Sequence, residues 1–293
     1  MITSRSYSDD YENIVRFLEE AYKENNNQDC WLPQKWEYTE YLVDKLHRER
    51  DNTPCWHNNI RIWEENNAII AVAHTESDDS IFIEIKKGYE NLYPKILDWC
   101  EENISNDCQV SVFTLESMKY REEELKRRGY KKEIEISEDK DKGQYQNCQC
   151  LNSKTYETTL PYGFEIVCHY DVKDDYVRQY AVHKGFHPND EFPAPDAYVI
   201  PFLSMEKAPM FDGNLELMIK DISENKYVGM VVFWYNKETN TAMLEPMSIH
   251  PEYHGKGLGY GLIMEGLRRL KKMGVNKVYV ESFNSNRKAF YNK

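Results

Sequence analysis

The chain has 293 residues, which is long for one compact domain and suits two, and its 41% hydrophobic and 13% aromatic residues predict folded cores rather than disorder. The formal net charge of −13, without a stripe rich in Lys and Arg, argues against binding to nucleic acid. The opening "MITSRSYSDD" lacks an apolar signal segment and the longest apolar runs are too short to cross a bilayer, so we expect a soluble cytoplasmic protein with no membrane partner.

The first half reads as a sheet with helices. "NIRIW" and "AIIAVAH" flank "EENN" and predict a hairpin over 59–74. Further patterns predict, in chain order, a strand at 80–85, a helix at 92–103, a strand at 108–113 and a charged helix at 120–128 that ends before Gly129. "YKKEIEIS" and "QYQNCQCL" then predict a closing hairpin around "EDKDKG". The polar segment 152–161, which ends in proline, predicts a boundary between two domains, 1–152 and 160–293.

The second half repeats this order of elements. Its patterns predict a strand at 162–167, a helix at 171–183, a proline-rich loop at 184–201, strands at 215–221, 226–236 and 241–249, a helix at 260–273 and a strand at 275–283. Pro246 lies inside one of these strands and predicts a bulge or broken pairing there. Because sequence identity between the halves is negligible, the repeat rests on the order of elements alone.

Seven cysteines are scattered through the chain, and only Cys148 and Cys150 lie close together. No second pair with histidines completes a zinc pattern, so we expect reduced thiols and no metal. His250 and His254 lack a carboxylate partner at metal-ligand spacing and are interpreted as surface histidines.

Glycines stand at every second position from 255 to 261, between an apolar strand and a helix. A glycine-rich turn before a helix binds anions, because unpaired N–H groups and the helix dipole point at the ligand and no Cβ obstructs it. A Walker A loop fails here because Lys256 is followed by Gly257. A Rossmann turn fits poorly, since the spacing is G-x-G-x-G-x-G and several antiparallel strands come first.

The stretch "LEPMSIHPEYHGKGLGYGLIMEGLRRLKKMGVNKVYVESFNSNRKAFYNK" resembles the GNAT superfamily of N-acetyltransferases over about fifty residues, from the fourth strand of that fold to its fourth helix. The family loop has an Arg/Gln-x-x-Gly-x-Gly/Ala core, in which His254 takes the Arg/Gln position and Gly257 and Gly259 are the two glycines. The resemblance implies an α+β fold with two GNAT-like domains, each a mixed, mostly antiparallel sheet flanked by helices in three layers. It also implies acetyl-CoA as co-substrate.

The resemblance implies two sets of contacts with acetyl-CoA. The main chain of Met247, Ser248 and Ile249 would pair with the pantetheine arm. The amides of the loop would hold the pyrophosphate; these belong to His254, Gly255, Lys256, Gly257, Leu258, Gly259 and Tyr260. Asn284 matches a family asparagine that contacts the coenzyme arm, although an N-cap of the following helix would explain it as well.

Two residues are candidates for proton transfer. Tyr291 matches the tyrosine that protonates the coenzyme thiolate in many relatives, and its phenol stays protonated at neutral pH. A packing tyrosine is the alternative. Glu245 is placed to act as general base toward the amine, directly or through water, or it only shapes the bulge beside Pro246. Asp190, Glu191 and Asp196 would form an acidic rim for a cationic amine, or a solvated loop.

The first half departs from the family loop. "KKGYENLYPK" at 86–95 holds one glycine and no nest for a pyrophosphate. We therefore expect a degenerate N-terminal domain and one acetyl-CoA site per chain. The expected activity is N-acetylation of the primary amine of a small molecule. The alternatives are a non-catalytic acyl-CoA-binding or regulatory module and a protein lysine or N-terminal acetyltransferase.

The second half reaches Lys293 soon after its last predicted helix begins, without the two closing strands of relatives. The strand at 278–280 would then keep unpaired backbone groups along an open edge. We expect either that the natural chain is longer or that another segment covers the edge. The N-terminal half or a second subunit, in a homodimer, could provide that segment.

Overall fold

A computed structural model describes residues 1–25, 31–76, 80–104, 110–132, 145–152, 154–172, 174–191, 196–282 and 291, apart from the side chains of 50, 51, 145 and 196–199. By its internal contacts the chain forms two units. The first comprises Met1–Thr39 and Thr53–Lys142, and the second comprises Glu40–Asn52 and Gly143–Lys293. None of the described helices combines the length and hydrophobicity that crossing a bilayer requires.

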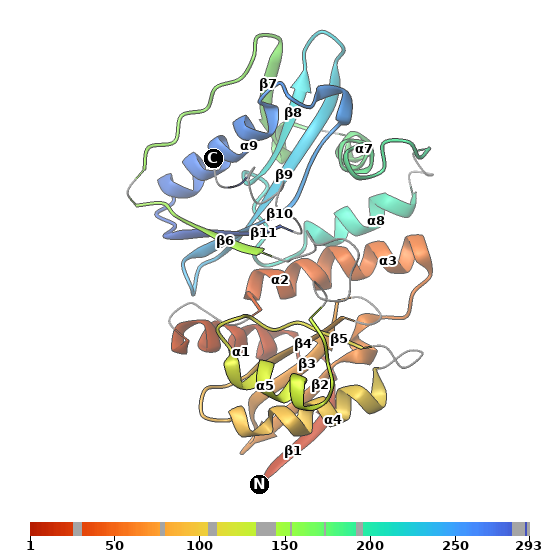
Figure 1. Ribbon diagram of the computed structural model, residues 1–293. Helices are drawn as coiled ribbons and strands as arrows, with labels where there is room; N and C mark the ends of the chain where they lie inside the picture. The colour runs from red at the N-terminus through yellow and green to blue at the C-terminus, as the bar shows by residue number, and fades with distance from the viewer. Residues whose placement is uncertain are drawn as a thin grey trace. The chain divides into compact units, whose positions relative to one another are not determined.

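The first unit is built on a five-stranded sheet in the order β1-β2-β3-β4-β5 (Figure 1). Its strands are β1 (Ile2–Ser6), β2 (Arg61–Glu65), β3 (Ala68–Thr75), β4 (Ser80–Ile85) and β5 (Ser111–Val112). Its helices are α1 (Tyr11–Glu24), α2 (Pro33–Tyr38), α4 (Tyr93–Asn103) and α5 (Lys119–Arg127), with short 3-10 turns at Trp56–Asn59 and Glu90–Leu92. All pairs are antiparallel except β4 with β5, which are parallel and joined through α4.

The second unit is built on a six-stranded sheet in the order β6-β11-β10-β9-β8-β7. Its strands are β6 (Tyr145–Cys150), β7 (Phe164–Cys168), β8 (Glu216–Asp221), β9 (Lys226–Asn236), β10 (Thr241–Ile249) and β11 (Lys277–Ser282). Its helices are α3 (Asp44–Asp51), α7 (Asp175–Phe186), α8 (Asp196–Met205) and α9 (Leu258–Lys272), with 3-10 turns at His169–Asp171 and Pro251–Tyr253 and a π-helix at Thr39–Val43 before α3. Among the strands that the structure describes in this unit, β10 and β11 alone run parallel, and α9 joins them. Both sheets thus share one plan, which confirms the predicted α+β class and the predicted repeat.

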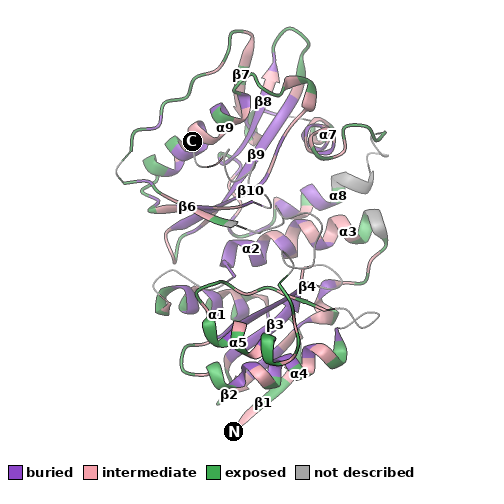
Figure 2. Ribbon diagram, viewed as in Figure 1, coloured by how far each residue is buried: buried purple, intermediate pink, exposed green. Residues whose placement is uncertain are grey.

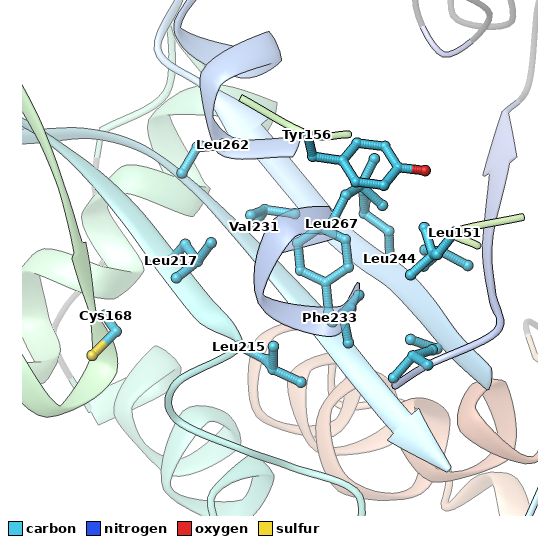
Figure 3. Packing of buried hydrophobic residues seen from close by; sticks show 14 of the residues in the cluster. Leu151, Tyr156, Cys168, Leu215, Leu217, Val231, Phe233, Leu244, Leu262 and Leu267 are labelled. Atoms are coloured by element: carbon cyan, nitrogen blue, oxygen red, sulfur yellow. The ribbon is translucent and has the colours of Figure 1, made fainter. Parts of the chain in front are cut away.

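The core of the second unit lies between α9 and one face of its sheet (Figures 2 and 3). Leu262 and Leu270 of α9 pack with Val231 and Phe233 of β9, and all four are fully buried. In a strand, alternate residues face opposite sides, so Val232 and Trp234 face away from this core. Helix α7 covers that other side: its Gly185 lies so close to Ser248 of β10 that a Cβ would overlap the serine side chain.

One predicted pairing is wrong. The segment 144–151 was expected to close the first sheet, but its strand β6 pairs antiparallel with β11, with Cys148 opposite Tyr279. Asn147 Nδ2 also donates to Ser282 Oγ at 3.1 Å. Strand β6 therefore covers the edge that the sequence leaves open, as the prediction of a covering segment required. The contact division places residues 143–152 with the second sheet for this reason. Most of the expected partner strand at 130–137 lies outside the described residues.

A second correction concerns 184–201, which the prolines and turn formers predicted to be a loop. Helix α8 begins at Asp196 and includes Pro201. Phe202 and Met205, three residues apart, are buried at 2% and 0% exposure. Burial of this apolar face outweighs the helix-breaking tendency of the proline, which lacks one N–H donor.

Candidate active site

Strand β10 carries a bulge at the predicted position. Its register with β9 shifts between Leu244 and Met247, on either side of Pro246. The fully buried Trp234 of β9 donates its indole N–H to the carbonyl oxygen of Glu245 at 2.6 Å. This bond holds the bulge in place and uses a carbonyl that the strand ladder no longer pairs.

The loop after β10 is open at two glycines. Gly255 and Gly257 have φ values of +77° and +79°, and a Cβ built on either would meet no atom within 4 Å. Residues with a Cβ rarely adopt this backbone, so glycine is required here for conformation, while the space beside it stays free. Both residues are exposed, as is Lys256 between them.

Gly257 is also the N-cap of α9. No side chain caps the helix, and the Gly261 N–H donates to the Gly257 carbonyl at 3.0 Å. The amides of the first turn, at Leu258, Gly259 and Tyr260, precede that bond and have no acceptor within the helix. An uncapped helix start beside two glycines with free space suits a phosphate group.

His254 and Lys256 shape this loop. His254 Nε2 lies 2.8 Å from the Ile249 carbonyl oxygen, which ties the loop back to the end of β10. Lys256 Nζ lies over the ring of Tyr253 at 4.5 Å from its centroid and contributes a positive charge at the mouth of the loop. His250 Nδ1 accepts the N–H of Glu252 at 3.3 Å. Among the described residues, no group of three His, Cys, Asp or Glu side chains could hold a metal ion.

Gly261 serves a different purpose from Gly255 and Gly257. A Cβ there would lie 2.6 Å from Leu160 Cδ2 and 3.3 Å from the Thr159 carbonyl oxygen, since residues 154–160 cross α9 at this point. Thr158 Oγ1 donates to Glu265 Oε2 at 2.8 Å, further along the same helix. Two of the alternating glycines thus serve the loop, and a third lets the segment after β6 lie close to the helix.

Met247, Ser248 and Ile249 follow the bulge. Ser248 is buried, and its Oγ donates to the Ala181 carbonyl oxygen of α7 at 3.2 Å, while Met247 and Ile249 are half-buried. Tyr291 packs against the edge of the core, and its hydroxyl lies 4.0 Å from Met247 Sδ. The structure therefore brings Tyr291 beside the bulged strand, across 44 residues of sequence.

The other predicted site residues lie at the bulge, after α7 or outside the described residues. Glu245 is half-buried at the bulge itself. Asn284 lies outside the described residues, as does the side chain of Asp196. Asp190 and Glu191 are exposed after α7, where Lys184 Nζ donates to the Asp190 carbonyl oxygen at 2.6 Å.

A buried charge network on α7 and β8 escaped the sequence analysis. Arg178 is fully buried and binds Glu216 through two hydrogen bonds, from Nε at 2.8 Å and from Nη2 at 2.7 Å. Its Nη1 donates to Glu206 at 2.5 Å and to Asp175 at 2.8 Å. Burial by itself lowers the pKa of Arg178, but the pairing with Glu216 and the other carboxylates outweighs it and raises that pKa. No short motif reveals this network, because Glu216 lies 38 residues from Arg178.

In the first unit, the loop that precedes α4 takes the place of the glycine loop, and the side chain of Glu90 occupies it. Gly88 has φ +94°, but its N–H already contacts both carboxylate oxygens of Glu90, at 2.9 and 3.1 Å. A protein carboxylate therefore takes the amide that faces an anion in an open loop.

We compared the sequence and the structure with those of known proteins. Residues 171–293 match the model of the Acetyltransferase (GNAT) family. A comparison with curated proteins found no match. The chain is similar in structure to a GCN5-related N-acetyltransferase from Sphaerobacter thermophilus, with TM-score 0.61 and 14% identity, over 97% of this chain and 87% of that one. It is also similar to a tandem GNAT protein from the clavulanic acid biosynthesis pathway, with TM-score 0.62 and 10% identity, over 100% of this chain and 93% of that one.

A third similar structure is an acetyltransferase from the GNAT family from Colwellia psychrerythraea, with TM-score 0.52 and 9% identity, over 100% and 92% of the two chains. At such identities these likenesses establish the fold. The family match covers the C-terminal part of the chain alone, and the two sheets together have the fold of the tandem GNAT structures.

Proposed function

We propose that the second unit transfers an acetyl group from acetyl-CoA to the primary amine of a small molecule. The observation that carries this proposal is the open loop at Gly255 and Gly257, which precedes the uncapped start of α9 and follows the bulged strand β10. The family match covers this same part of the chain. Acetyl-CoA would supply the acetyl group as a thioester.

The residues of the loop fit the anionic end of that co-substrate. The amides from His254 to Tyr260 would hold the pyrophosphate, since the space beside Gly255 and Gly257 is free and Lys256 adds a positive charge. The main chain of Met247, Ser248 and Ile249 would pair with the pantetheine arm, and Asn284 would contact it. The interruption of the β9–β10 ladder at Pro246 supports this role for the backbone of β10.

Two side chains would move protons. Glu245 would accept a proton from the substrate ammonium, directly or through water, so that the neutral amine can attack the thioester carbonyl carbon. As the C–N bond forms and the C–S bond breaks, the Tyr291 phenol would donate its proton to the departing thiolate, and the proton that the new amide nitrogen loses would restore the phenol. The position of the Tyr291 hydroxyl, 4.0 Å from Met247 on the bulged strand, supports this assignment.

The acceptor in this proposal is a small amine rather than nucleic acid, in keeping with the net charge of −13. Asp190 and Glu191, exposed after α7, would attract such a cation. The expectation of a homodimer came from an open edge at β11, and β6 covers that edge, so the proposal needs no second subunit.

Calorimetry with acetyl-CoA, followed by release of free thiol in the presence of a panel of amines, tests the proposal. One binding site per chain and amine-dependent thiol release are expected. Binding without thiol release from any amine would favour a non-catalytic acyl-CoA-binding module. Release only with peptides would favour a protein acetyltransferase.

A further inference from the structure

The bulge of β10 leaves Glu245 weakly held by the strands on either side. The register with β9 shifts between Leu244 and Met247, so the two residues there, Glu245 and Pro246, stand opposite a single residue of β9. On the other side, the described pairing of β10 with β11 ends at Met243. The ladder of the sheet therefore fixes the main chain of Glu245 less firmly than it fixes the rest of the strand.

The indole of Trp234 holds this main chain by a different bond. Its Nε1 donates to the Glu245 carbonyl oxygen at 2.6 Å, across 11 residues of sequence. Trp234 is fully buried, and its ring packs against Phe211 at a centroid distance of 6.4 Å and an interplanar angle of 62°. A side chain packed in this way keeps one rotamer, so the fold fixes the position of its N–H group. The bulge is thus tied to a rigid donor.

The Glu245 side chain leaves the strand on the same face of the sheet as Trp234. Ala242 and Leu244 of β10 belong to the core under α9, so Met243 and Glu245 face the other side. Trp234 faces that side as well, because it alternates with the core residues of β9. Fixing the Glu245 carbonyl restricts the rotation of its main chain. The bond from the indole therefore also restricts the direction in which the carboxylate points.

We infer that Trp234 is a positioning residue for Glu245, an inference that rests on the proposed acetyl transfer. A general base acts only when it lies within hydrogen-bond reach of the proton that it removes, and a displacement of about 1 Å can lower the rate severely. The indole N–H keeps the carboxylate of Glu245 in one place relative to the bulge. Met247 and Ser248 are again paired with β9, so the part of β10 assigned to the pantetheine arm does not depend on this bond.

A double-mutant cycle in the full chain tests the inference. The rate of free thiol release is measured with acetyl-CoA and the best acceptor among ethanolamine, 1,4-diaminobutane, benzylamine and glucosamine. Trp234→Phe keeps a ring and removes the donor, and it should lower turnover by about tenfold, the equivalent of one hydrogen bond. Glu245→Gln should lower turnover by about a hundredfold. Added to Glu245→Gln, the change Trp234→Phe should cost less than about twofold more, because the carboxylate to be positioned is gone.

Two controls separate positioning from a general loss of packing. Trp63→Phe makes the same change at a tryptophan of the first unit that is 2% exposed, and it should leave turnover unchanged. Acetyl-CoA affinity, measured by titration calorimetry, should stay within about twofold in Trp234→Phe, since the paired part of β10 is kept. If circular dichroism shows that Trp234→Phe does not fold, benzothienylalanine at position 234 takes its place in the cycle. This analogue keeps the shape of the indole and has sulfur in place of the N–H group.

A loss of turnover that disappears in the Glu245→Gln background supports the inference. Unchanged turnover in the folded Trp234 variant would overturn it, as would an equal loss in both backgrounds, which would show a merely structural role. Thiol release that Glu245→Gln leaves intact would overturn the inference and the role of Glu245 as base, while acetyl transfer itself would stand. The absence of thiol release from the unaltered chain with all four amines would refute the proposed transfer, and the inference with it.

Discussion

Two glycines of helix α9 allow a matched test of the anion loop. Gly257 precedes the helix with φ +79°, and Gly274 follows it with φ +83°, and a Cβ at either would meet no atom within 4 Å. Replacing each by alanine therefore imposes the same backbone strain on the same helix, with no new packing contact in the protein. Only Gly257 belongs to the proposed phosphate site.

The expected magnitudes separate strain from binding. A residue with a Cβ in the left-handed region costs about 1–2 kcal/mol, so both variants should lose about this much stability, or a few degrees of Tm. At Gly257 the new methyl group also occupies the space that a phosphate would enter. A hydrogen bond to a charged group contributes about 1.5–3 kcal/mol, so displacing one amide contact should weaken acetyl-CoA binding by about tenfold to a hundredfold.

Urea denaturation measures the first quantity and titration calorimetry with acetyl-CoA the second. We expect equal losses of stability in Gly257→Ala and Gly274→Ala, and a loss of affinity only in Gly257→Ala. Unchanged affinity in Gly257→Ala would refute the role of the loop as a phosphate site. Equal losses of affinity in both variants would show that helix strain, and not occupied phosphate space, had weakened binding.

Three further predictions follow from the second unit. Tyr291→Phe should keep acetyl-CoA affinity within about twofold and lower turnover by about a hundredfold, which is the usual contribution of a proton donor. Steady-state release of free thiol measures this turnover. Unchanged turnover would show that Tyr291 is a packing residue. Burial raises the pKa of Glu265, but hydrogen bonds from Arg268, Arg269 and Thr158 outweigh burial and lower that pKa to about 2. The contacts of the charged Glu265 therefore stabilise the fold above pH 4.5, its ordinary pKa, and this stabilisation is lost as the pH falls toward about 2. In urea denaturation, the stability advantage of the unaltered chain over the Glu265→Gln variant should therefore shrink as the pH falls over that range. Gly266→Ala should destabilise by about 1–3 kcal/mol, because the added Cβ would overlap the Phe233 ring, and Phe233→Leu in the same chain should relieve part of that loss in a thermal melt.

Local patterns in the sequence were sufficient for much of the second unit. The strands predicted at 226–236 and 241–249 have those bounds in the structure, because each is a largely apolar segment that directly follows polar turn residues. The bulge at Pro246 was predictable for an equally local reason: proline cannot donate to a strand ladder. Glycines before an amphipathic helix likewise indicated the open loop and the family. The particular use of Gly261 was not predictable, since it depends on Leu160, a hundred residues earlier, crossing the helix there.

Only the tertiary structure decided which segments meet. Strand β6 has no sequence feature that selects β11 over a strand of the first sheet, because backbone hydrogen bonds are the same at every open edge. Arg178 finds Glu216 for a comparable reason: once both side chains are buried on facing elements, each charge requires the other. Helix α8 forms despite Pro201 because the tertiary structure buries Phe202 and Met205. The spacing of apolar residues and the positions of turn-forming residues act over a few residues, so they can be recognised in the sequence. The pairing of edge strands and the burial of charged pairs depend on neighbours that only folding brings together.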